Sequence, residues 1–109
     1  MASGKVNLYN YAPDYANKQL ITALRELNGT YTVPENGFIF AGLIKNNDDA
    51  ISEYIVTSCG ITVIRYYSSA RNYNSAIIPV KKGDVLSCTT SVNMYWADNY
   101  GPYFIPLCV

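Results

Sequence analysis

The chain has 109 residues, no net formal charge at pH 7, no histidine and eleven tyrosines. This length allows one domain with a substantial apolar core. Charged residues make up 15% of the chain, against roughly 25% in an ordinary soluble domain, so we expect part of the surface to be covered by something else. The balanced charge excludes an electrostatic footprint for nucleic acid, and no apolar run approaches the roughly 18 residues of a membrane span.

The first part of the chain has few strand signals. Residues 1–16 are expected to form an extended lead-in, followed by a single β-sandwich domain over residues 17–109. Apolar residues then recur at helical spacing over residues 17–27, with Asn17 as a possible cap and Gly29 after the end. Two alternatives remain open there, a short N-terminal helix and a strand around residues 19–22. The spaced apolar residues are Leu20, Ala23, Leu24 and Leu27.

After Gly29 the sequence alternates between short apolar segments and turn residues. The turns contain Pro and Gly, which supply the fixed and positive backbone dihedrals that tight turns require. About eight short strands at regular spacing predict an all-β fold, an antiparallel jelly-roll-like β-sandwich. The expected strands cover residues 30–33, 38–45, 53–58, 61–67, 76–80, 85–90, 92–96 and 103–108.

Two of these strands are apolar on both faces. A sandwich strand with one solvated face should alternate apolar and polar residues, and residues 38–45 and 76–80 do not. One interpretation is a central strand covered by the N-terminal segment; the other is a contact between subunits, which would also account for the scarcity of charge. Pro79 restricts its strand to an edge or a bulge. The subunit-interface candidates are Phe38, Ile39, Phe40, Ala41, Leu43, Ile77 and Ile78.

The sequence offers little catalytic chemistry. Without histidine, the usual base for a Ser or Cys nucleophile and the commonest metal ligand are missing. The three cysteines are odd in number and widely spaced, so we expect buried free thiols rather than a disulfide framework. We therefore predict a protein that is not an enzyme, with no catalytic residue, metal or other cofactor.

Two segments combine aromatic and polar residues, at positions 66–74 and 95–103. Tyrosine supplies a large contact area at low conformational-entropy cost, and Asn, Asp and Arg supply hydrogen bonds, which is typical of a recognition surface. Aromatic rings beside amides and carboxylates also suit a sugar. Alternatively, individual tyrosines pack in the core or against another subunit. The candidates for binding a receptor or glycan are Tyr67, Arg71, Tyr73, Tyr95, Trp96, Asp98, Asn99 and Tyr100.

Four motifs occur in an order that resembles the C-terminal head domains of bacteriophage tail fibres. They are PDYA at residues 13–16, GTYTVPENGFI at 29–39, IPVKKGDV at 78–85 and YFIPL at 103–107. Residues 31–40 are also similar to an early strand of the heads of the complement and tumour necrosis factor superfamily. Both groups are trimeric jelly-roll sandwiches, so the resemblance implies a homotrimer.

The resemblance further implies a viral fibre tip that binds a glycan or protein on the host surface. Its expected location is the virion, after synthesis without a signal peptide in the cytoplasm of the bacterial host, and neither nucleic acid nor membrane insertion is expected. Two other functions remain open: a monomeric carbohydrate-binding module and a purely structural virion decoration protein. A stable monomer in solution would refute the trimer, and glycan-array binding by a monomer would favour the first of these. Retained host-cell binding after substitution of Trp96 and Arg71 would favour the second.

Overall fold

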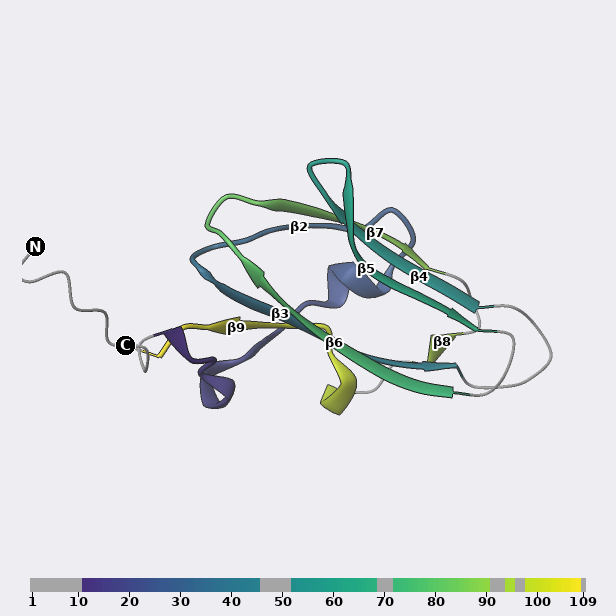
Figure 1. Cartoon of the computed structure of the whole chain (residues 1–109), viewed down its shortest axis with the longest axis horizontal. Coiled ribbons are helices and arrows are strands. Elements are labelled where there is room, and N and C mark those ends of the chain that lie inside the picture. Colours follow the sequence, from purple (N-terminus) through teal and green to yellow (C-terminus); the bar gives the residue numbers. More distant parts are fainter. Residues whose placement is uncertain (1–10, 46–51, 69–71, 91–93, 96–97, 109) are drawn as a thin grey trace, which may run out of the picture.

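The computed structural model describes residues 11–45, 52–68, 72–90, 94–95 and 98–108. Two sheets face each other in the described part of the chain (Figure 1). The 3-10 turns are η2 (Tyr15–Asn17), η3 (Thr22–Arg25) and η4 (Asp98–Tyr100). The strands are β1 (Gln19–Leu20), β2 (Thr30–Thr32), β3 (Gly37–Lys45), β4 (Ser52–Ser58), β5 (Ile61–Ser68), β6 (Asn72–Val80), β7 (Val85–Thr90), β8 (Met94–Tyr95) and β9 (Tyr103–Pro106).

The strand order is that of a jelly roll. One sheet has the order β1-β9-β3-β6, with the short β8 also paired to β3, and the other has the order β2-β7-β4-β5. Every described pairing is antiparallel. Successive strands therefore alternate between the two sheets, except for the β4–β5 hairpin and the β8–β9 segment along β3, as in a double Greek key. The predicted antiparallel sandwich is confirmed.

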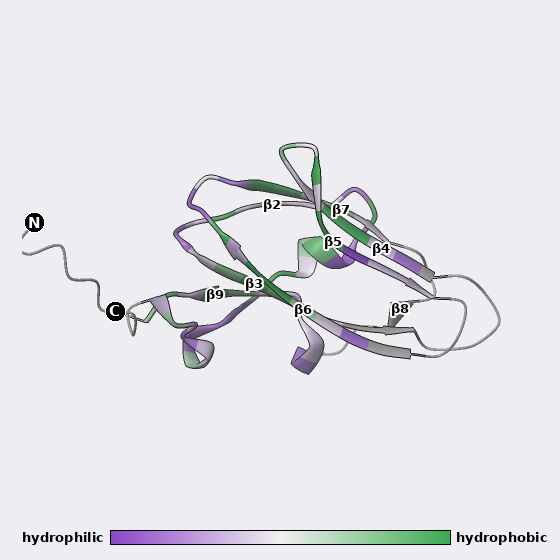
Figure 2. Ribbon diagram, viewed as in Figure 1, coloured by the Kyte–Doolittle hydropathy of each residue, from purple (hydrophilic) through white to green (hydrophobic). Residues whose placement is uncertain are grey.

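The core lies between the sheets and is supplied by every second residue of the strands. Ile39 and Ala41 of β3 are fully buried in it, beside Phe104 of β9. These two residues were expected at a subunit interface, and that prediction is wrong because the period of two turns them toward the facing sheet. Hydrophobic residues concentrate in the strands, while the β2–β3 and β6–β7 turns are hydrophilic (Figure 2). The buried core cluster is Ile21, Leu24, Val33, Ile39, Ala41, Tyr54, Val56, Ile64, Tyr66, Leu86, Cys88 and Phe104.

The segment of residues 17–27 contains no α-helix. Its middle is the short strand β1, which pairs with β9, and the 3-10 turn η3 follows. The helical spacing does not mark a buried helix face. Of the four spaced residues, Leu24 alone is fully buried, while Leu20 and Leu27 are exposed. Further upstream, Asp14 N–H donates to the Pro106 carbonyl at 2.8 Å. The described end of the lead-in thus hydrogen-bonds to the sandwich.

Strand β6 is an edge strand, as Pro79 predicted. Pro79 has no N–H to donate, and Ser75 N–H is taken by the Asn74 side-chain oxygen at 2.8 Å. Residues 75 and 79 are an even number of positions apart, so their backbone nitrogens point to the same edge of β6. This is the edge that faces away from β3. This edge therefore offers fewer free donors to an incoming strand.

All three cysteines are free, but only Cys88 is buried. Cys59 is exposed at the tip of the β4–β5 hairpin, where Cys59 and Gly60 both have positive φ, 51° and 78°. Such a two-residue turn matches the twist of the flanking strands. Cys108 is half-buried. The expectation of free thiols is confirmed, whereas that of burial holds for Cys88 alone.

Candidate functional site

The two aromatic segments converge at one end of the sandwich. Tyr73 at the start of β6 and Tyr95 in β8 are both in register with Ile44 of β3, one from each side. Strand pairing thus brings together backbone positions that are far apart in the chain. Strands β3 and β5 also end there, and β4 and β6 begin there (Figure 1). We call this the recognition end.

The turn η4 lies beside this end, on the outer face of β3. Gly42 makes the close approach possible, because a Cβ at this position would lie 3.1 Å from the Tyr100 carbonyl oxygen and 3.2 Å from the Tyr100 Cα. Within the turn, Asp98 and Asn99 are exposed and Tyr100 is half-buried. Tyr103 donates its hydroxyl to the Asp98 carbonyl. The turn therefore presents one carboxylate and one carboxamide to solvent.

The remaining recognition candidates are distributed as follows. Tyr67 is 57% exposed near the end of β5, in the other sheet but toward the same end. For Tyr73 and Tyr95 the structure gives backbone positions. Arg71 and Trp96 lie outside the described residues. Of the interface candidates, Phe38, Phe40 and Ile77 lie on the outer face of β3 and β6, Ile78 packs against the core, and Leu43 lies on β3.

The outer face of the β1-β9-β3-β6 sheet is apolar. Phe40 is in register with Ile77 on one side and Tyr103 on the other. Ile77 is 44% exposed and Leu20, opposite Tyr103, is 38% exposed. A pocket of about 440 Å³ continues this face toward the β6–β7 turn. Phe38, Pro79 and Leu107 are among its lining residues. We call this sheet surface the apolar face.

No strand position on the apolar face carries a charge in the described residues. The registered positions are Leu20, Phe38, Phe40, Gly42, Ser75, Ile77, Pro79, Tyr103 and Ile105. At its margin, the Lys18 ammonium lies 5.6 Å from the centroid of the Tyr103 ring.

The outer face of the second sheet has a different character. Thr30 and Ser87 are registered neighbours there, and both are exposed. Arg65 of β5 forms an exposed ion pair with Glu53 of β4, with 3.3 Å between Nη2 and Oε2. Tyr67 and Val85 are exposed on the same face, at 57% and 50%. The second sheet therefore mixes polar, charged and apolar positions on its outer face, whereas the strand positions of the apolar face carry no charge.

A polar cluster inside the core fixes η3. The Leu24 carbonyl accepts hydrogen bonds from the Tyr54 hydroxyl at 2.8 Å and from the Cys88 thiol at 3.2 Å. Burial raises the pKa of the Cys88 thiol to about 11, although its hydrogen bond to Tyr54 acts in the opposite direction. Burial, and next the neighbouring Cys88, raise the pKa of the Tyr54 hydroxyl as well. Both groups are therefore protonated donors at neutral pH.

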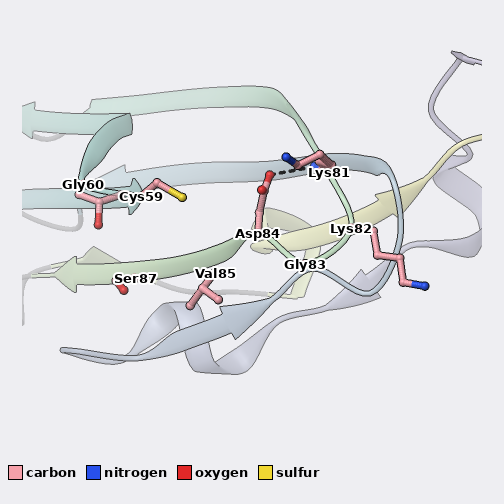
Figure 3. Close-up of a pocket in the computed structure, with 9 residues that line it drawn as sticks. Cys59, Gly60, Lys81, Lys82, Gly83, Asp84, Val85 and Ser87 are labelled. Carbon is pink, nitrogen blue, oxygen red and sulfur yellow. Dashed lines mark hydrogen bonds between the residues drawn. The ribbon is translucent and has the colours of Figure 1, made fainter.

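A second candidate pocket lies at the opposite end, between the tip of the β4–β5 hairpin and the β6–β7 turn. It has a volume of about 570 Å³ and is lined by residues that include Thr57, Cys59, Lys81 and Asp84. Figure 3 shows Asp84 turned toward Lys81, whose backbone N–H donates to its Oδ2 at 2.9 Å, while Lys82 points away from the hairpin tip. The lining offers charges of both signs but no histidine to activate the Cys59 thiol. Residues 81–84 lie between two expected strands, and the sequence alone did not predict this pocket.

Comparisons with known proteins returned neither a matching family model nor a matching curated protein. Among the described residues, no group of three or more His, Cys, Asp or Glu side chains is arranged to hold a metal ion. In the same part of the chain, no helix has the length and apolar character needed to cross a membrane.

Proposed function

We propose that this protein is the head domain of a homotrimeric viral fibre of the tail-fibre type, and that it binds a host-surface glycan or protein through the recognition end. Its role is binding rather than catalysis, and its place is the virion. The observation that carries the proposal is the register of Tyr73 and Tyr95 on either side of Ile44. This register brings the two Tyr- and Asn-rich segments to one end of a rigid sandwich. Both segments have the composition of recognition loops.

The apolar face supports self-association. In a symmetric assembly, a residue close to the rotation axis meets copies of itself, so a charge there would face its own like charge. The strand positions of the apolar face carry no charge, and Phe40 and Ile77 are registered neighbours in it. Lys18, over the Tyr103 ring, and Asp98 of η4 lie beside these positions. Copies of the same chain can therefore meet at Phe40 and Ile77 without like-charge repulsion. Such a cover also accounts for the low charged fraction, 15% of the sequence.

Light scattering of the purified protein tests the association. We expect the mass of three 12.1 kDa chains. Phe40→Asp and Ile77→Asp should reduce the mass to that of one chain or yield aggregate, because each places a charge where copies meet. Thr89→Asp, on the exposed outer face of the other sheet, is the matched control and should leave the trimer intact. A wild-type monomer would refute the trimer and favour a monomeric carbohydrate-binding module.

Binding to a panel of whole bacterial cells and to an array of bacterial surface glycans tests the recognition end. We expect the wild type to bind a subset of these, and Tyr67→Ala, Tyr95→Ala and Asn99→Ala to weaken binding by ten-fold or more. Lys82→Ala at the opposite end is the control. Undiminished binding by all three variants would refute the location. Binding to none of the cells and glycans would refute receptor recognition and favour a structural decoration protein.

A further inference from the structure

We propose that Arg25 is the positioning residue of the recognition end: it fixes the conformation of η4, and thereby the placement of Asp98 and Asn99 for a receptor. The consequence for binding rests on the function proposed above, whereas the effect on η4 does not. Arg25 lies more than 70 positions from η4 in the sequence and was not among the predicted site residues. The inference follows from three connected sets of contacts.

The first set makes η3 a rigid support. Leu24 is fully buried in the core. Its carbonyl is held by the Tyr54 hydroxyl at 2.8 Å and the Cys88 thiol at 3.2 Å, which come from two neighbouring strands of the facing sheet. The next residue in the chain is Arg25. The backbone of Arg25 is therefore held in place independently of its side-chain contacts.

The second set joins the Arg25 side chain to the segment around η4. Its Nε–H donates to the Gly101 carbonyl at 2.8 Å, and its Nη2 lies 3.7 Å from the Asp98 Oδ1. The Arg25 side chain is only 18% exposed, whereas that of Asp98 is 86% exposed. An ion pair with such an exposed carboxylate is weak, because solvent screens it. The bond to the Gly101 carbonyl, made by a mostly buried guanidinium, is therefore the stronger restraint.

The third set leaves η4 little room to move. On one side its backbone packs against Gly42, where even a Cβ would be crowded by Tyr100. Next to Gly101, the Pro102 carbonyl accepts a hydrogen bond from Ile21 N–H at 2.8 Å. The segment is thus held from the β3 side by packing and from the η3 side by hydrogen bonds. Arg25 is the side chain that connects η3 to both Asp98 and Gly101.

Lysine cannot replace this residue. The guanidinium presents Nε–H and Nη–H donors in a fixed fork and reaches two acceptors at once, whereas an ammonium is a single flexible point charge. Loss of the fork should leave the sandwich folded, because β3 and β9 retain their pairing. The turn η4, which precedes β9, should then move with a larger amplitude on the ps–ns timescale. A receptor that requires one arrangement of Asp98 and Asn99 would consequently bind more weakly.

Backbone ¹⁵N relaxation tests the effect on η4 directly. In the wild type, we expect order parameters near ~0.85 at residues 98–101, the value of rigid backbone, and in Arg25→Gln and Arg25→Lys a fall below ~0.6 confined to those residues. Residues of β3 and β9 should not change. Asp98→Asn removes only the ion pair and should stay near the wild-type value. Arg65→Gln, which breaks an exposed ion pair on the other sheet, is the matched control.

The outcomes separate the two proposals. A local fall in both Arg25 variants supports the positioning role, and a parallel ten-fold loss of binding to the bacterial cells or glycans supports its functional consequence. Unchanged order parameters at 98–101, or a uniform change throughout the sandwich, would refute positioning. If the wild type binds no cell and no glycan while the local fall is observed, the proposed receptor function fails and the role of Arg25 in fixing η4 stands.

Discussion

The two donors to the Leu24 carbonyl should act redundantly, because either one alone keeps this buried oxygen hydrogen-bonded. Tyr54→Phe removes one donor but leaves the Cys88 thiol on the same oxygen, so the carbonyl stays satisfied. The expected loss is that of one net hydrogen bond, about 1 kcal/mol. Cys88→Ala should cost a similar amount, since Tyr54 then remains. For a chain of 109 residues, a loss of about 1 kcal/mol corresponds to a fall in Tm of roughly 4 °C.

The double variant Tyr54→Phe/Cys88→Ala should lose more than the sum of the single variants. It leaves a fully buried carbonyl without either of these donors, which adds an unsatisfied polar group at about 1–3 kcal/mol. Urea unfolding at one fixed protein concentration measures each free energy, because association makes apparent stability depend on concentration. Cys59→Ala, at the exposed hairpin tip, is the control partner and should be additive with Tyr54→Phe. Additivity of the first pair within about 0.5 kcal/mol would refute the shared-acceptor reasoning.

Two further predictions concern alkaline pH and the β6 edge. The Cys88 thiol has a pKa of about 11 in the fold against an ordinary value of 9.0, so its contribution to stability is complete below pH 9 and is lost as the pH rises to about 11. Urea unfolding from pH 7 to 11 should show this loss, and Cys88→Ala should reduce it; parallel curves for the two proteins would contradict the assignment. At the edge, Asn74→Ala/Pro79→Val frees the Ser75 N–H and restores a donor at position 79, so light scattering should show faster aggregation at constant Tm than in Asn74→Asp, which keeps an acceptor. Equal rates for both variants would show that the edge is protected by something else.

Much of the β-architecture could be predicted because it depends on local signals. Turn residues such as Pro34 and Gly83 and the apolar segments between them have their effect wherever the chain folds, so the strands from β2 to β7 lie close to their expected places. The beginning of β6 was the exception. Residues 72–74 are polar and were expected in a loop, but pairing with the end of β3 extends the strand through them. Long-range pairing outweighs a weak local preference there.

The N-terminal segment shows the same limit. The spacing of Leu20, Ala23, Leu24 and Leu27 left a helix and a strand around residues 19–22 both open, and the structure has a short strand at 19–20 followed by a 3-10 turn. The free edge of β9 accepts β1, and the core accepts Leu24 and Ile21 but neither Leu20 nor Leu27. Neither the edge nor the core cavity is visible in the segment itself. Tertiary structure therefore overrode the periodicity.

For the candidate site, the sequence by itself determined the chemistry and the tertiary structure decided the geometry. Composition identified the low charge, the tyrosines and the two-sided apolar strands, because these are properties of single residues and of neighbours in the chain. It could not divide residues 38–45 into the buried Ile39 and Ala41 and the outward Phe38 and Phe40, since which face meets the second sheet depends on the register of every strand. It also could not find Arg25, whose role arises from contacts with residues more than 70 positions away.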